Sequence, residues 1–348
     1  MDNNNNFPKL HNATWPGIVG KGENSEPPID LDQLLELTVS AEFEGHKFDG
    51  IDIGLWEPHF DINISNGGLN KIADKVGALN LNIGTLVAPI WGGSAMGSKT
   101  DRALYLEMVR KSCRFGQKLR ELGVRPYGVV RIDSACSTAD WAKEPLANTR
   151  LIAETFSAAC DIAADYGETL AAEGEVCWGG MHSLEAMITT LESVDRPNFG
   201  FQADMAHTLL YMLEEHSPHY RMLPQDFTWE DRATFNAGME RMASYLRPWT
   251  LDFHVAQSDG TVFGSGSHDK TGRHCTATDR HGKLDIVHDA GYWLRDENGA
   301  VTKTFKHICW DGCMFPNQVM LDPQTWNAVL EKLIKIRAAH GWRQDPIG

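Results

Sequence analysis

The feature that most restricts the fold of this chain is a regular alternation of short apolar segments with longer amphipathic ones. Continuous apolar runs of strand length are typical of parallel strands that are covered on both faces. The stretches between them repeat their apolar residues at helical spacing. Eight such pairs follow one another, and their strand-like segments are KLHNATW, FDGIDIGLW, LNIGTLVAPI, YGVVRIDSA, ETLAAEGE, NFGFQADMAH, WTLDFHVAQ and FKHICWDG. This order predicts an α/β fold with a parallel sheet.

Eight strand-helix pairs in 348 residues predict a closed (β/α)8 TIM barrel. Two helices are expected to stop at Gly123 and Gly167, and Ser183 is expected to cap another. A doubly wound open sheet is the alternative, although the chain has neither a GxGxxG motif after a strand nor a P-loop. No linker divides the sequence, so residues 1–348 are expected to form one domain, with a long polar loop insertion at about 256–284.

The amino-acid composition argues against two classes of binding partner, membranes and nucleic acids. No run of eighteen apolar residues is present, so no membrane partner is expected. The formal charge of −15 argues against a nucleic acid, because phosphate binding needs a basic surface. The seven cysteines are odd in number and scattered, which argues against a disulfide framework and for a reducing compartment. Because the first residues lack the pattern of a signal peptide, we expect a cytoplasmic protein.

Polar side chains gather at the ends of the predicted strands. In a (β/α)8 barrel these ends form the functional face. The early ends carry Trp15, Trp56 and Trp91, and the later ends carry Arg131, Glu173, Glu175, Asp204, His207, His254, His307 and Asp311. Carboxylates and imidazoles that converge from neighbouring strands suit a divalent ion such as Mn²⁺ or Mg²⁺. The sequence therefore predicts a metal site at the mouth of the barrel.

The segment FQADMAH has two interpretations. Asp204 ends an apolar strand, so its carboxylate can point into the mouth and bind a metal ion. It can also cap the helix that follows, which is a common role for aspartate. The presence of Glu173 and His254 at the ends of the adjacent strands favours the metal interpretation. His207 lies three residues further on, where it can hydrogen-bond a substrate oxygen.

The order of these ligands resembles the xylose isomerase-like barrel superfamily of sugar isomerases and epimerases, over about residues 10–340. The resemblance implies that Glu173, Asp204 and His254 bind the metal, with Mn²⁺ expected and Mg²⁺ or Co²⁺ as alternatives. It also implies that His207 binds substrate. Family members usually end the last strand on glutamate, and here that strand has none.

The fourth metal ligand is therefore either His307 or Asp311, which share a face of the last strand. If His307 were the ligand, the strand would be TKTFKH, which is too polar for a buried parallel strand. Asp311 is the favoured ligand. The epimerases of the family also use a second glutamate as an acid/base, and the nearest one here is Glu175, only two residues after the first ligand. This position departs from the pattern of the epimerases and argues against epimerase chemistry.

Three further segments, GSGSHDKTGRHC, GKLDIVHDAGYWLRDENG and HICWDGCMFPN, are similar to the large subunit of bacterial C-glycoside deglycosylating enzymes. This resemblance implies a divalent metal, a small β-sandwich partner subunit, and cleavage of the carbon–carbon glycosidic bond of 3-keto C-glycosides. The predicted function is therefore a metal-dependent carbon–carbon lyase. A ketose isomerase or 3-epimerase is the alternative.

Both reactions begin in the same way. A metal ion polarises a carbonyl, and a base removes a neighbouring proton to give an enolate. His207, Glu175 and His307 are the candidate bases. Trp15, Trp56 and Trp91 suit stacking on a sugar or aglycone, and Arg131 and His274 suit an acidic or phenolic group, although core packing and solvated-loop roles compete. An inactive scaffold and a metal-dependent endonuclease are the remaining alternatives.

Overall fold

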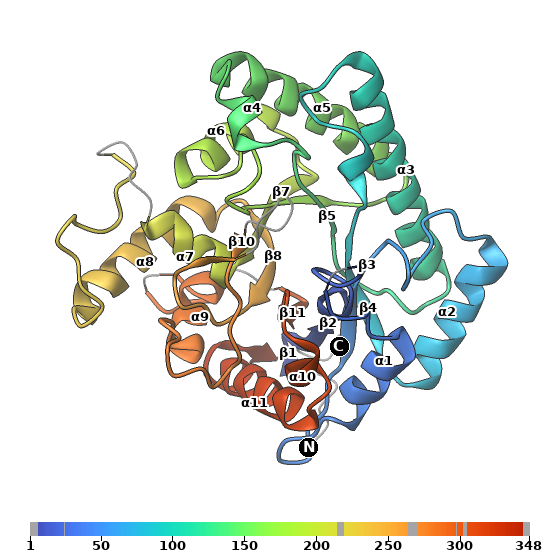
Figure 1. Ribbon diagram of the computed structural model, residues 1–348. Coiled ribbons are helices and arrows are strands. Elements are labelled where there is room, and N and C mark those ends of the chain that lie inside the picture. Colours follow the sequence, from blue (N-terminus) through green and yellow to red (C-terminus); the bar gives the residue numbers. More distant parts are fainter. Residues whose placement is uncertain are drawn as a thin grey trace.

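Eight parallel strands close into a barrel in the computed structural model, which describes residues 6–23, 25–213, 219–263, 271–296, 298–301 and 305–343. The strand order around the barrel is β11-β2-β3-β4-β5-β6-β7-β8 (Figure 1). The strands are β2 (Lys9–Ala13), β3 (Gly50–Gly54), β4 (Asn82–Val87), β5 (Val130–Ile132), β6 (Leu170–Glu173), β7 (Phe199–Asp204), β8 (Thr250–Val255) and β11 (His307–Trp310). The predicted (β/α)8 barrel is confirmed, and the open-sheet alternative is wrong.

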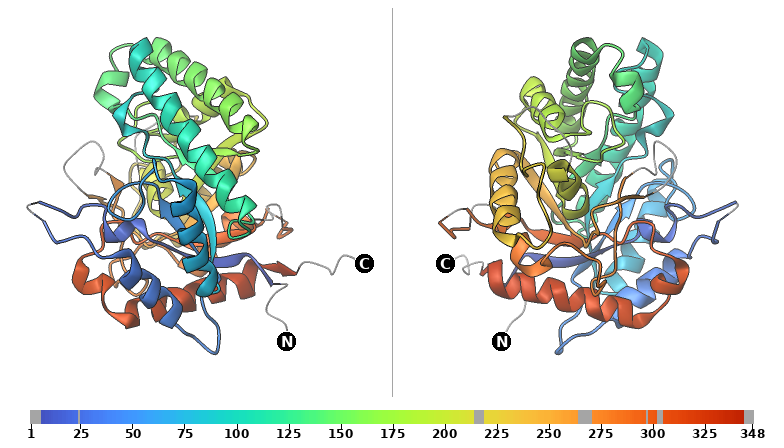
Figure 2. Two further views of the ribbon diagram at one scale, coloured as in Figure 1. Left: turned by 90° about the vertical axis from the view of Figure 1, so that its right-hand side faces the viewer. Right: turned by 60° about the vertical axis from the view of Figure 1, so that its left-hand side comes forward.

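Helices surround the barrel on its outer side (Figures 1 and 2). Each barrel strand is followed by at least one of them before the next barrel strand begins. The helices are α1 (Leu31–Ser40), α2 (Asn66–Ala78), α3 (Lys99–Glu121), α4 (Thr138–Trp141), α5 (Pro145–Asp165), α6 (Leu184–Val194), α7 (Met205–Leu213), α8 (Arg232–Leu246), α9 (Ile286–Leu294), α10 (Asn317–Met320) and α11 (Pro323–His340). None of the helices in the described ranges is long and apolar enough to cross a bilayer.

Local sequence signals set the helix ends. Gly123 follows α3 with φ 78° and Gly167 follows α5 with φ 65°, a left-handed conformation that glycine adopts without strain. Ser183 accepts a hydrogen bond from the Ala186 amide at 3.2 Å and caps α6. The predicted stops and the predicted cap are all confirmed.

Side chains on β11 alternate between the two sides of the barrel wall. Ile308 and Trp310 are fully buried and pack in the main core between the barrel and the helices. Cys309 packs inside the barrel against Ala13, Trp15 and Val87. His307 and Asp311 share the inward side with Cys309, because successive strand residues face opposite sides.

The insertion predicted at about 256–284 forms a small hairpin. Strands β9 (Val262–Phe263) and β10 (Thr271–Gly272) pair antiparallel, and residues 264–270 between them lie outside the described part of the chain. The Gly272 amide donates to Nδ1 of His207, which lies on α7. A second ribbon joins the two ends of the described chain, since β1 (Asn6–Phe7) pairs with β12 (Trp342–Arg343). The single-domain assignment of residues 1–348 stays a prediction.

Candidate metal centre

Four side chains converge at the carboxyl ends of the last four barrel strands. Glu173 ends β6, Asp204 ends β7, His254 lies near the end of β8, and Asp311 directly follows β11. Each offers one ligand atom, these atoms all lie within 4.8 Å of one another, and all four residues are buried. The His254 Nδ1 atom lies 3.8 Å from Glu173 Oε1 and 3.8 Å from Asp311 Oδ2.

Three of these side chains have a buried atom without a hydrogen-bond partner among the described residues. The atoms are Glu173 Oε1, Asp204 Oδ2 and His254 Nδ1. Leaving a buried polar atom unpaired costs about 1–3 kcal/mol. A shared ligand would satisfy all three atoms at once. Carboxylate oxygens with one imidazole nitrogen are donors for a divalent cation, so the residues fit the metal site that the sequence predicts.

The remaining atoms of the same side chains are held by the protein. Glu173 Oε2 pairs with the Arg131 guanidinium. Asp204 Oδ1 accepts from the amides of Ala206 at 2.7 Å and His207 at 3.1 Å. One oxygen of Asp204 therefore caps the first turn of α7, and the other remains available to a metal, as the metal interpretation requires.

Buried neighbours orient the side chains of Asp311 and His254. The Trp15 indole donates to both oxygens of Asp311, at 3.2 and 3.1 Å, and the Cys313 amide donates to Asp311 Oδ1 at 2.7 Å. On the far side of the His254 ring, Nε2 lies 3.5 Å from Asp252 Oδ2 and 3.7 Å from Asp52 Oδ2. Two carboxylates beside Nε2 favour a proton there, which leaves the Nδ1 lone pair directed at the centre.

The electrostatics of the site favour a cation. Burial and the carboxylates around Glu173 outweigh Arg131 and raise the pKa of Glu173 well above its usual value. Burial opposes the charged form of His274, but Asp204 and Asp311 raise the pKa of this imidazole to about 9. The carboxylates around Glu173 and His274 contribute to both shifts, so they create a negative potential at the centre that a divalent ion would offset.

A small cavity beside the four ligands brings most of the other predicted residues together. It has a volume of about 30 Å³, room for roughly one water molecule, so a sugar can enter only after lining side chains move. It is lined by Trp15, Trp56, Trp91, Arg131, Glu175, His207 and Asp311, with Val19, Cys313 and Met314. Seven residues from distant parts of the sequence thus meet at one mouth.

The lining side chains are tied to one another. Arg131 pairs with Glu175 as well as with Glu173. The rings of Trp56 and Trp91 meet edge to face, with centroids 5.1 Å apart. His207 lies on the first turn of α7 rather than in a loop, with Nε2 3.8 Å from Glu173 Oε1.

Two predicted residues do not line this cavity. His274 is buried beside the metal ligands, with Nε2 3.5 Å from Asp204 Oδ1, so it faces a ligand rather than open space. His307 begins β11, and its Nε2 lies 3.1 Å from Asp52 Oδ2. Asp311 lies four positions further along the chain, a spacing of about 13 Å for an extended strand. The structure therefore does not place His307 at the mouth as a candidate base.

Sequence reasoning missed a second group of buried polar residues inside the barrel. His11, Asp52, Gln202 and Asp252 are all nearly or fully buried. Asp252 accepts from Gln202 Nε2 at 2.5 Å and from the Thr85 hydroxyl at 3.0 Å. The available signal was an aspartate inside the apolar run GIDIG, because a charged residue within a buried strand needs a partner.

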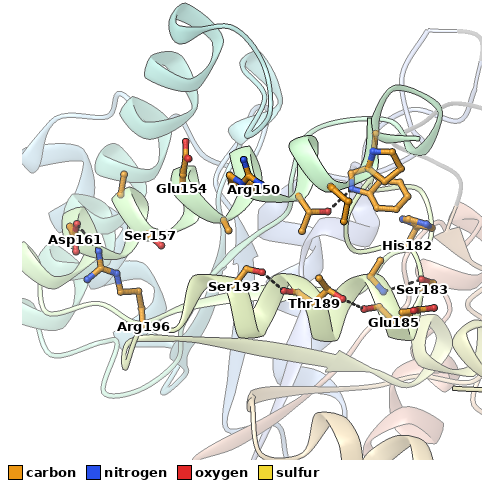
Figure 3. A pocket seen from close by; sticks show the side chains of 17 residues that line it. Arg150, Glu154, Ser157, Asp161, His182, Ser183, Glu185, Thr189, Ser193 and Arg196 are labelled. Atoms are coloured by element: carbon orange, nitrogen blue, oxygen red, sulfur yellow. Dashed lines mark hydrogen bonds and ion pairs between the residues drawn. The ribbon is translucent and has the colours of Figure 1, made fainter. Parts of the chain in front are cut away.

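A larger hollow than this cavity lies elsewhere on the described surface. It is an open groove between α5 and α6 on the outside of the barrel, with a volume of about 1060 Å³ (Figure 3). Its walls carry mostly small side chains, such as Ala153, Ser157 and Ala186, and Figure 3 shows its charged groups spread along the helices. The donor atoms at the mouth of the barrel converge, whereas the charged groups of the groove are spread out. The mouth is therefore the better candidate for a catalytic site, despite the smaller volume of its cavity.

Comparison with known proteins agrees with this geometry. Residues 41–291 match the model of the family described as xylose isomerase-like TIM barrel. A comparison with the sequences of curated proteins finds no match.

Solved structures share the fold at low identity. A D-tagatose 3-epimerase-like protein has a TM-score of 0.61 at 13% identity and covers 95% of this chain and 98% of its own. The 3-keto-D-glucoside 4-epimerase YcjR from E. coli has a TM-score of 0.53 at 13% identity and covers 95% and 100%. The IOLI protein with a zinc atom has a TM-score of 0.56 at 14% identity and covers 95% and 99%. With the family match extending over most of the barrel, the chain belongs to the xylose isomerase-like TIM barrel family.

Proposed function

We propose that the protein is a divalent-metal-dependent isomerase or epimerase that acts on a ketose or a keto-sugar. The observation that carries the proposal is the set of three buried donor atoms without partners, on Glu173, Asp204 and His254, beside a cavity that holds a further carboxylate and an imidazole. The names of two similar structures, a 3-epimerase-like protein and a 3-keto-glucoside 4-epimerase, support the same class of substrate. Mn²⁺ is the proposed ion.

A divalent ion held by Glu173, Asp204, His254 and Asp311 would polarise a substrate carbonyl and so acidify the neighbouring C–H bond. Glu175 is the proposed base, because its carboxylate lines the cavity. Its pairing with Arg131 holds the carboxylate in place. Transfer of that proton to the adjacent carbon gives an isomer, whereas an epimer forms when a second group delivers a proton to the same carbon from the opposite face.

His207 acts differently from the base role first considered for it. Its Nδ1 accepts from the Gly272 amide at 3.3 Å, so a neutral ring carries its proton on Nε2. This Nε2 atom lies 3.8 Å from Glu173 Oε1, on the side of the ring toward the proposed metal site. His207 is therefore proposed to donate a hydrogen bond to a substrate oxygen, where negative charge develops as the proton leaves.

The test is exchange of substrate hydrogen with solvent. Metal-loaded protein is incubated in D2O with free ketoses and with 3-keto-glucosides, and loss of the C–H signal next to the carbonyl is followed by NMR. Glu175→Gln is expected to slow the exchange by about 10²–10⁴-fold while the metal stays bound. Glu185→Gln in the outer groove is the matched control and is expected to exchange at the wild-type rate. Unchanged exchange in Glu175→Gln contradicts the proposed base.

The second candidate function is cleavage of the carbon–carbon bond of 3-keto C-glycosides. It is favoured by the proposal of one carboxylate base, Glu175, because elimination needs only one such group: the proton that the base removes next to the carbonyl can pass to the aglycone carbon as the carbon–carbon bond breaks. Inversion of a carbon instead needs proton-transfer groups on both faces. The same incubations, followed for release of the aglycone with and without a candidate small β subunit, separate the two functions. Aglycone release with no epimer formed assigns the lyase.

We also propose that the protein works in the cytoplasm. All seven cysteines lie in the described ranges and are free thiols, as expected in a reducing compartment.

A further inference from the structure

We propose that the barrel interior holds a second divalent ion, bound by His11, Asp52 and His307 and separate from the ion at the mouth. The three residues are hereafter the lower cluster, because His307 begins its strand whereas the mouth ligands end theirs. His11 Nδ1 lies 2.8 Å from Asp52 Oδ1, and His307 Nε2 lies 3.1 Å from Asp52 Oδ2. All three side chains are buried, and their ligand atoms lie within 4.8 Å of one another.

The first argument is the close approach of three donor atoms to one another beside Gly84. A Cβ atom built on this glycine would lie less than 3.0 Å from Asp52 Oδ1, 2.6 Å from His307 Nε2 and 2.9 Å from His11 Nδ1. A side chain at position 84 would therefore clash with all three donor atoms, and glycine lets them converge. Transition-metal ions bind nitrogen and oxygen donors at about 2.0–2.2 Å, so a shared ion needs donors that converge in this way.

The second argument is charge. Asp52 is fully buried, and so is Asp252, whose Oδ1 lies 3.7 Å from His307 Nε2. Two buried carboxylates attract positive charge, and a divalent ion would supply it.

The donor set indicates the kind of ion. Two imidazoles and one carboxylate favour Zn²⁺ or Co²⁺ over Mg²⁺, which prefers oxygen ligands. The Tyr127 hydroxyl lies 3.0 Å from His11 Nε2, so it orients the ring from its far side, as groups behind metal-binding histidines do. A cavity of about 330 Å³ at the same end is lined by Tyr127, Asp252 and His307 and provides an entry path.

The strands that carry the ligands suggest what the ion does. His11 lies on β2, the first barrel strand, and His307 on β11, the last one, and these two strands pair where the barrel closes. An ion bound by both would tie the beginning of the barrel to its end. The expected role is stabilisation of the closed barrel, with no part in the reaction at the mouth.

The experiment is a Co²⁺ titration of the chelator-treated protein, followed by elemental analysis and by the visible spectrum of the bound ion. Wild type is expected to bind two equivalents. Glu173→Ala is expected to keep one, and the bound Co²⁺ is expected to raise the melting temperature of this variant. His307→Gln is expected to keep only the mouth equivalent, and the double variant to bind none.

Two further variants make the result independent of damage to the fold. Gly84→Ala adds a methyl group that clashes with the three donor atoms without removing any of them. This variant is expected to lose the same equivalent as His307→Gln. Tyr127→Phe removes only the outer hydrogen bond and is expected to keep both equivalents, with weaker binding of one. Circular dichroism checks that each variant is folded. Wild type that binds one equivalent, lost in Glu173→Ala, overturns the second site and leaves the mouth site intact; two equivalents in folded His307→Gln also overturn it.

Discussion

The two oxygens of Asp204 have different surroundings. Its Oδ1 accepts the first amides of α7, and its Oδ2 has no partner within the described residues. The two interpretations of FQADMAH were posed as alternatives, but they are compatible, because the cap uses one oxygen and leaves the other available to a metal.

This division predicts that the two roles can be separated by mutation. Asp204→Asn keeps an oxygen that can cap α7 but loses the negative charge, so the variant is expected to bind the mouth ion at least about tenfold more weakly with little loss of stability. Asp204→Ala loses the cap as well and is expected to be about 0.5–2 kcal/mol less stable. Elemental analysis and urea unfolding measure the two effects. Equal stability of the two variants contradicts the cap.

The ligand residues differ in how visible they are in the sequence. Glu173 and Asp204 each end an apolar run and His254 lies near the end of one, so the pattern that locates the strands also locates these residues. The partners of the lower cluster were not visible, because Asp52 and His307 are 255 positions apart and lie within strands. Barrel closure brings them together, and no local pattern records which inward residues meet across it.

At the scale of elements, the hairpin of β9 and β10 holds the site from the side. The Gly272 amide fixes the Nδ1 side of His207, and a Cβ on this glycine would lie 2.5 Å from the Ala206 carbonyl oxygen. The hairpin can therefore approach α7 only because residue 272 is glycine. The spacing of apolar residues predicted the barrel strands and most helices. It did not predict this hairpin, because the sequence there is polar and has no periodic pattern of apolar residues.

We expect Gly272→Ala to push β10 away from α7 and to release the hydrogen bond to His207. Turnover is expected to fall by at least about tenfold, because the donor to the substrate oxygen is no longer fixed. Metal content is expected to stay at the wild-type level, because neither Gly272 nor His207 is a proposed mouth ligand. Thr261→Ala in the same hairpin is the control for general disturbance. Loss of metal from Gly272→Ala would show that the hairpin supports the ligands instead.

At the scale of the whole molecule, the mouth ligands come from four consecutive positions around the barrel, β6, β7, β8 and β11. An ion that binds all four binds the folded barrel and not the unfolded chain. Such an ion stabilises by about 2.7 kcal/mol at a free concentration one hundred times its dissociation constant.

Chelation is therefore expected to lower the melting temperature of the wild type, and added Mn²⁺ to restore it. Glu173→Ala is expected to start from a lower melting temperature and to gain little from Mn²⁺, because the mouth donors are incomplete. Differential scanning fluorimetry over a range of Mn²⁺ concentrations measures both effects. A wild-type melting temperature that does not depend on Mn²⁺ contradicts a mouth site coupled to folding.

The alternation of side chains along β11 limits which mutations this strand can accept. His307, Cys309 and Asp311 face the interior, and Ile308 and Trp310 face the helices. Because successive side chains face opposite sides, inserting or deleting one residue within this strand would reverse the orientation of the residues on one side of the change. Ile308 or Trp310 would then point at the buried carboxylates inside the barrel. We expect point substitutions in β11 to be accepted far more readily than single-codon insertions or deletions.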